Sequence, residues 1–266
     1  MNTSRAFLSE WILLNRRRIW AGLVATTLAF TVVSVWLLIA SASPSASRPT
    51  GRPAVDLEAL TGPGGATAAV VASAGLGTIL VIATFIAAMG NDITRGTLRV
   101  AMTHTPGRLS LITGKLVARI AVATTLMVLA LASGAVTAAI VAPGRSVDTA
   151  GWFGADGLLD AGTDLARLLF FVGFYALVGT TLAVLVRSTP IAIGIGLLWF
   201  GPLENVIAGD REWAQRWFPG LVMRAVVDPA APHVLSTGAA AAVLCGYGAL
   251  CAAVIAISVT RRDVAR

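Results

Sequence analysis

The chain has 266 residues, of which 56% are hydrophobic and only 12% are charged, and its mean hydropathy is +0.82. Soluble domains carry about 25% charged residues, so this composition excludes an ordinary soluble fold and indicates a lipid bilayer as solvent. The formal net charge of +7 is typical of Lys and Arg retained on the cytoplasmic side of a membrane. No basic stripe carries interleaved aromatic residues, so nucleic acid is not an expected partner.

An amphipathic segment, residues 1–18, precedes the first long apolar run. Its apolar side chains gather on one side of a helical projection, namely Phe7, Leu8, Trp11, Ile12 and Leu14. Ser9 and Glu10 lie on the opposite side. The pattern predicts a helix that lies in the cytoplasmic interface of the membrane. The alternative is a first membrane helix that begins early, but this would place the Arg16-Arg17-Arg18 block in hydrocarbon.

A transmembrane helix needs about 20 apolar residues. Six runs are candidates: 19–40, 66–90, 116–142, 165–186, 191–207 and 235–259. The stretches between them are too short for a soluble domain. We therefore predict an all-α polytopic membrane protein with six transmembrane helices, in which residues 1–266 form a single transmembrane domain.

The distribution of charge predicts the orientation of the six runs. The side that holds both termini carries most of the Lys and Arg residues, and the other side carries most of the Asp and Glu residues. The positive-inside rule then places both termini in the cytoplasm. A cleavable signal peptide ending near Ala42 is the alternative for the first run, which at about 22 residues exceeds the usual length of 7–15.

A short basic segment, residues 91–115, lies between the second and third runs. Helix breakers and caps divide it at Thr94, Gly96, Pro106 and Gly107. The pattern predicts a short helix at 97–103. Arg99 within this helix and Arg95 and Arg108 on either side of it give it a cationic surface, and its apolar side chains are Leu98, Val100 and Met102. Such a helix suits docking into a groove on a partner, although a loop that only sets membrane topology has the same composition.

The ordered set Asp92, Gly96-Thr97, Pro106, Arg108 and Gly114-Lys115 resembles the cytoplasmic signature of ABC-2 type export permeases. Members of that family carry an acidic residue four positions before Gly-Thr, then a short helix, Pro-x-Arg, and Gly-Lys at the start of the next span. The resemblance extends over the whole chain, including the terminal Arg-Arg-Asp at 261–263.

The resemblance implies the permease subunit of an ATP-driven exporter in a bacterial cell membrane. Its implied partners are a second, identical or different, permease and a cytoplasmic ATP-binding subunit, which would bind ATP and Mg, so no cofactor is expected on this chain. The residues implied to couple the two subunits are Asp92, Gly96, Thr97, Arg99, Pro106 and Arg108. Asp92 departs from the family, which more often has Glu there, and its shorter side chain reaches less far toward the partner or the interfacial helix. Lys115 and Arg119 are expected to extend to lipid headgroups.

The fifth run contains Gly201-Pro202 followed by Glu204-Asn205. The 14 residues 190–203 would extend about 21 Å at 1.5 Å per residue, which is shorter than the hydrocarbon core of about 30 Å. We therefore expect the helix to break in the outer leaflet and residues 201–234 to form an outer-leaflet or extracellular segment. Trp213, Trp217 and Phe218 beside Arg211 and Arg216 are typical of a membrane interface.

Glu204 and Pro202 are candidates for the export pathway or an outer gate. The alternative, which the position near the expected membrane edge favours, is a Glu204 that is hydrogen-bonded at headgroup level and has no role in transport. Asp164 and Arg167 are three residues apart and are expected to pair on one helix face.

The chain has no phosphate-binding loop, nucleophile elbow or H-E-x-x-H motif. Its two histidines, His104 and His233, are far apart, so we expect no catalytic residue and no metal site. One alternative function is a membrane enzyme acting on lipid, with an acid–base set of Glu204, Asp210, Asp228 and His233. Another is a non-transporting membrane partner of a similar ATPase.

Overall fold

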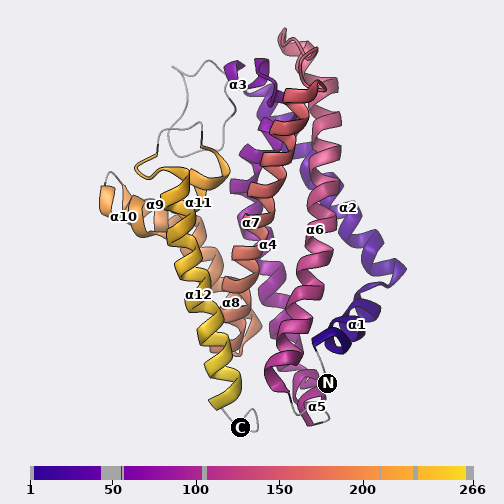
Figure 1. The fold of residues 1–266 in the computed structure, drawn as a ribbon, viewed down its shortest axis with the longest axis vertical. Coiled ribbons are helices and arrows are strands. Elements are labelled where there is room, and N and C mark those ends of the chain that lie inside the picture. The colour runs from indigo at the N-terminus through magenta and orange to yellow at the C-terminus, as the bar shows by residue number, and fades with distance from the viewer. Residues whose placement is uncertain are drawn as a thin grey trace. The chain divides into compact units, whose positions relative to one another are not determined.

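The computed structural model describes residues 3–42, 55, 57–103, 107–209, 211–229 and 233–261. Within these ranges the protein is helical and has no strand (Figure 1). Six candidate membrane spans are present in the described residues: Arg17–Ala40, Gly65–Thr94, Arg108–Arg145, Ala155–Val186, Thr189–Ala208 and Thr237–Thr260. Each overlaps one predicted run, but the third begins at Arg108, inside the predicted loop 91–115, and the fourth begins at Ala155, both earlier than predicted. The chain is therefore an all-helical protein whose spans are long and apolar enough for a multi-pass membrane protein.

A separate helix, α1 (Thr3–Leu14), precedes the first span, α2 (Arg17–Ala40). Asn15 and Arg16 separate the two helices and belong to neither. The N-terminal segment thus forms a helix of its own, which ends before the first span begins. Ala6 and Glu10 form its buried face.

The chain forms two compact units. One contains residues 17–77 and 124–170, and the other contains residues 1–16, 78–123 and 171–266. The helices α4 (Gly65–Thr94), α6 (Arg108–Val141) and α7 (Ala155–Val186) contribute residues to both.

The unit formed by residues 17–77 and 124–170 buries a carboxylate. The Asp164 carboxylate pairs with Arg167 at 2.8 Å and accepts a hydrogen bond of 2.6 Å from the Thr67 hydroxyl, which confirms the predicted pair and adds a partner from α4. In the same unit, the buried indole of Trp152 donates to the Leu60 carbonyl at 2.9 Å. This bond holds the short helix α3 (Leu57–Thr61), which precedes α4.

The fifth span does not break at Pro202, contrary to the prediction. It consists of α8 (Thr189–Leu198), the π-helical turn η3 (Trp199–Leu203) and α9 (Glu204–Ala208). Proline lacks an N–H, and its ring clashes with the carbonyl four residues earlier. The wider π turn accommodates it, since the Glu204 N–H donates to the carbonyl of Trp199. The 20 helical residues extend about 30 Å, which matches the hydrocarbon core.

After α9 the chain turns at Gly209, which has a φ of +44°, and forms α10 (Glu212–Trp217), α11 (Pro219–Val227) and the sixth span, α12 (Thr237–Arg261). Figure 1 shows α11 beside α12, and these two helices are in contact. In the same unit, Tyr175 of α7 is buried and packs edge-on against the ring of Phe200 at 5.2 Å. This aromatic contact joins α7 to the π turn.

Candidate functional site

The short helix predicted between the second and third spans is present as α5 (Thr97–Thr103). A tight turn joins it to α4. Gly96 has a φ of +71°, a left-handed conformation that glycine adopts without a steric cost. The Thr97 hydroxyl donates to the main-chain carbonyl of Asp92 at 3.1 Å and to its Oδ1 at 3.3 Å. These bonds tie the first residue of α5 to the last turn of α4.

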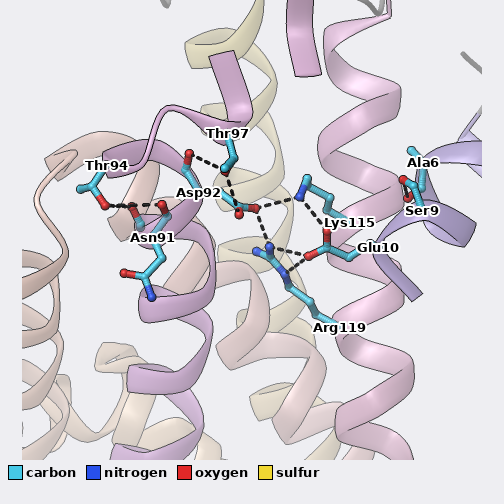
Figure 2. A network of polar contacts seen from close by, with 10 residues as sticks. Ala6, Ser9, Glu10, Asn91, Asp92, Thr94, Thr97, Lys115 and Arg119 are labelled. Carbon is cyan, nitrogen blue, oxygen red and sulfur yellow. Dashed lines mark hydrogen bonds and ion pairs between the residues drawn. The ribbon is translucent and has the colours of Figure 1, made fainter. Parts of the chain in front are cut away.

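Four charged side chains, Glu10, Asp92, Lys115 and Arg119, form a connected charge cluster (Figure 2). Lys115 Nζ lies 2.6 Å from Glu10 Oε2 and 2.9 Å from Asp92 Oδ2. Arg119 Nη2 lies 2.6 Å from Glu10 Oε1 and 2.6 Å from Asp92 Oδ2. Each cation on α6 thus bridges a carboxylate of α1 and a carboxylate of α4.

The expectation that Lys115 and Arg119 extend to lipid headgroups was wrong. Their side chains are only 10% and 9% exposed, because both turn inward to the two carboxylates. The cluster contains two acids and two bases, so its formal charges balance. Removing one partner of a buried ion pair leaves an uncompensated charge and costs about 3–5 kcal/mol. The cluster therefore fixes the relative positions of α1, α4 and α6.

Gly114 explains how α1 comes close enough to join the cluster. A Cβ at this position would lie 2.5 Å from the Cβ of Ala6 and 2.8 Å from the carbonyl oxygen of Thr3. The missing side chain therefore lets the backbone of α1 rest on α6, and the next residue, Lys115, reaches Glu10. The two residues of the Gly-Lys pair thus have complementary roles, one steric and one electrostatic.

The surface of α5 is divided between a buried and an exposed side. Leu98 is buried, whereas Val100 is 62% exposed. Arg95 is exposed and Arg108 is half-buried. Pro106 and the side chain of Arg99 lie outside the described part of the chain.

Of the predicted coupling residues, the structure brings Asp92 and Thr97 together directly, with Gly96 forming the turn between them. The Asp92 side chain is only 19% exposed, because it is occupied within the cluster. Glu10 was missed as a site residue. The signal was present in the sequence, since Glu10 is an acid on the polar side of an otherwise basic amphipathic segment.

The second predicted site lies at the end of the fifth span. Glu204 is 2% exposed, and its Oε1 accepts a hydrogen bond of 3.2 Å from the Gly220 N–H. The proposed acid–base set for lipid chemistry is not assembled by these contacts. The His233 ring lies 2.6 Å from the main-chain carbonyl oxygen of Asp228, and Asp210 lies outside the described residues.

Among the described residues, no group of three or more His, Cys, Asp or Glu side chains could hold a metal ion. Comparison of the chain with protein-family models and with curated proteins finds no match. The fold and the charge cluster define a helical protein with six candidate membrane spans, whose N-terminal helix is ion-paired to the junction of the second and third spans.

Proposed function

We propose that the chain is the permease subunit of an ATP-driven exporter of the ABC-2 type. It lies in a cell membrane with both termini in the cytoplasm, pairs with a second permease and binds a cytoplasmic ATP-binding subunit. ATP and Mg bind to that subunit. The observation that carries the proposal is the charge cluster, because it connects α1, α4 and α6 beside the short helix α5.

The exposed side of α5 is the proposed docking surface for the ATP-binding subunit. It presents Val100, with the cationic residues Arg95, Arg99 and Arg108 nearby in the sequence. A complementary partner has a groove with an apolar floor and an acidic rim. Asp92 and Thr97 do not need to contact that partner, since their bonds to each other hold α5 in position.

The exposed face of α1 supports its assignment as an interfacial helix. Leu8 and Ile12 are exposed on the side of α1 away from Ala6 and Glu10, and Leu13 is exposed at the end of the helix. Apolar side chains at this spacing enter the boundary between headgroups and acyl chains. The exposed Arg16, Arg17 and Arg18 that follow suit the anionic cytoplasmic leaflet.

In the proposed mechanism, closure of the ATP-binding subunits displaces α5. Thr97 and Asp92 pass this displacement to the end of α4, and Lys115 and Arg119 pass it to α6 and α1. A compensated, buried ion cluster resists deformation, so the helix ends move as a body. The second and third spans, α4 and α6, then tilt and open a pathway between the paired permeases.

The test is a pull-down of the tagged chain from its native membranes in mild detergent, followed by an ATPase assay. Val100→Asp and the double variant Arg99→Glu/Arg108→Glu are expected to lose the co-purifying ATP-binding subunit while still inserting into the membrane. Arg211→Glu is the matched control, since Arg211 is an exposed arginine on the side expected to face away from the cytoplasm. ATP-driven export that persists in the α5 variants would contradict the proposal.

The same preparation distinguishes a transporter from a non-transporting membrane partner. Both retain the ATP-binding subunit. A transporter is expected to show ATPase activity that rises with added substrate and ATP-dependent movement of that substrate into sealed vesicles, whereas a non-transporting partner shows no such movement.

A further inference from the structure

We propose that Glu204 is a positioning residue that latches the return segment, residues 211–227, onto the end of the fifth span, and that the export cycle releases this latch. The return segment comprises α10 and α11. The latch itself is a contact within this chain. Its release during export rests on the proposed function, and the experiment below separates the two.

The contact is made by a buried carboxylate at the start of a helix. The Glu204 Oε1 accepts from the N–H of Gly220, the second residue of α11. The N-terminus of a helix has unpaired N–H groups and a partial positive charge, both of which favour a carboxylate. Leu221, Trp199 and Arg224 also lie near this carboxylate. Within the described residues Glu204 forms no ion pair of 4.0 Å or less.

The fit around Gly220 shows that the contact is close. A Cβ on Gly220 would overlap the Glu204 carboxylate and would lie 3.2 Å from Cδ1 of Phe200. Gly220 therefore lets the start of α11 rest directly on the π turn and α9. Any larger side chain must displace either the Glu204 carboxylate or the start of α11.

The remainder of the return segment has an apolar buried face and further polar links, including bonds from α12. The Tyr247 hydroxyl donates to the Trp217 carbonyl at 2.9 Å and the Thr237 hydroxyl donates to the Ala225 carbonyl at 3.2 Å. Val222, Met223 and Val226 of α11 are buried. The Arg224 guanidinium donates to the Asn205 side-chain oxygen at 2.9 Å, but this bond is exposed. Because apolar packing is not directional, the contact of the buried Glu204 with the Gly220 N–H fixes where α11 begins, whereas the Thr237 bond lies near the other end of that helix. Loss of that contact frees the segment to shift along its apolar face.

The experiment measures how fast a buried reporter cysteine reacts. Cys245 and Cys251 are replaced with Ala, and Ala225→Cys is introduced in α11, where Ala225 is buried. The chain is placed in lipid nanodiscs, in which both faces are accessible, and is treated with a polar maleimide. Glu204→Ala is expected to raise the labelling rate at least tenfold, and Glu204→Gln, which keeps one acceptor oxygen, is expected to raise it less.

Two matched controls accompany this comparison. Glu212→Ala removes an exposed glutamate of α10 that pairs with Arg216 at 3.2 Å, and it is expected to leave the labelling rate unchanged. Ser236→Cys, an exposed reporter outside the return segment, is expected to react at the same rate in every variant. An unchanged rate at Ala225→Cys in the Glu204→Ala chain would overturn the latch.

A second variant keeps the test decisive if Glu204→Ala fails to accumulate. Gly220→Ala retains the carboxylate but displaces it, and is expected to raise labelling of Ala225→Cys by a similar factor. If neither Gly220→Ala nor Glu204→Gln raises the rate, the latch is overturned.

Release is tested by adding ATP and Mg to membranes that hold the complete complex. Faster labelling of Ala225→Cys is expected with ATP than without it. If the ATP-binding subunit co-purifies but ATP does not change the rate, release is overturned and the proposed function stands. If Glu204→Ala raises labelling but no ATP-binding subunit co-purifies, the proposed function fails and the latch stands.

Discussion

The two buried carboxylate sites of the unit that contains both chain termini are stabilised in opposite ways. Glu10 shares two cations with Asp92, and all four side chains are paired. Glu204 is equally buried but accepts a main-chain hydrogen bond and has no ion pair among the described residues. A buried carboxylate must be compensated in one way or the other, since an unpaired charge in a protein interior is costly.

This difference indicates two mechanical roles. A cluster that includes a two-nitrogen contact from Arg119 Nε and Nη2 to Glu10 has a defined geometry in several directions, so it transmits displacement. The Glu204 carboxylate is held by N–H groups at the start of one helix, with Trp199 beside it, so this contact defines where that helix starts and can open and reform. The proposed coupling of α5 therefore depends on the charge cluster, and the proposed latch depends on the hydrogen-bonded Glu204 carboxylate.

Glu10→Ala is expected to produce the largest effect. It leaves Lys115 and Arg119 buried with only the Asp92 carboxylate, which costs about 3–5 kcal/mol. The free energy of unfolding, measured by thermal or denaturant unfolding of the purified chain in mild detergent, is expected to fall by that amount. Limited proteolysis between α1 and α2 is expected to accelerate because α1 loses its anchor.

The matched change Glu212→Ala tests the reason for this loss. Glu212 is exposed and pairs only with Arg216, and surface pairs contribute about 0–1 kcal/mol. Glu204→Ala is expected to fall between the two, since leaving a buried donor unpaired costs about 1–3 kcal/mol. Equal losses for Glu10→Ala and Glu204→Ala would remove the distinction between the two sites.

Gly114→Ala is expected to have the second-largest effect. The added Cβ meets Ala6 and the backbone of α1, and overpacking of this kind costs about 1–3 kcal/mol. Displacement of α1 also lengthens the Glu10 contacts, so proteolysis near residue 15 is expected to accelerate as in Glu10→Ala.

The control for this change is Gly22→Ala in α2, where no atom lies within 4 Å of the added Cβ. Alanine is favoured over glycine in a helix by about 1 kcal/mol, so this variant is expected to be as stable as the parent or slightly more stable. If both glycine variants behave alike, the close approach of α1 to α6 does not limit stability.

The six spans, α5 and the Asp164–Arg167 pair were predictable because each depends on local pattern. Run length identifies a span, Gly96 identifies where α5 begins, and a spacing of three identifies a pair on one helix face. The charge cluster was only partly predictable: Glu10 stands out as an acid in a basic segment, but its partner Lys115 is 105 residues away. Nothing in the local sequence distinguishes a lysine that turns inward from one that extends to headgroups.

The predicted break in the fifth span was wrong for a different reason. Proline breaks a helix in most contexts, so Pro202 predicted the end of the helix. The π turn at Trp199–Leu203 absorbs the proline locally, which a count of apolar residues does not detect. The burial of Glu204 depends on α11 returning to the end of α9, and that arrangement is tertiary.

Thr97→Val is expected to have the smallest effect on stability and a larger effect on coupling. It removes the hydroxyl that donates to Asp92 while preserving shape, and an exposed hydrogen bond of this kind contributes about 0.5–1.5 kcal/mol. The charge cluster keeps its four ion pairs, so α1, α4 and α6 stay fixed and only α5 loosens. Substrate-stimulated ATPase activity and export of the assembled complex are expected to fall several-fold, whereas basal ATPase activity is retained.

The control is Thr84→Val, which removes a hydroxyl bond to the Leu80 carbonyl within α4 and is expected to change neither the stimulated ATPase activity nor export. A Thr97→Val complex that exports at the parent rate would show that the cluster couples to the partner without the Thr97–Asp92 bond.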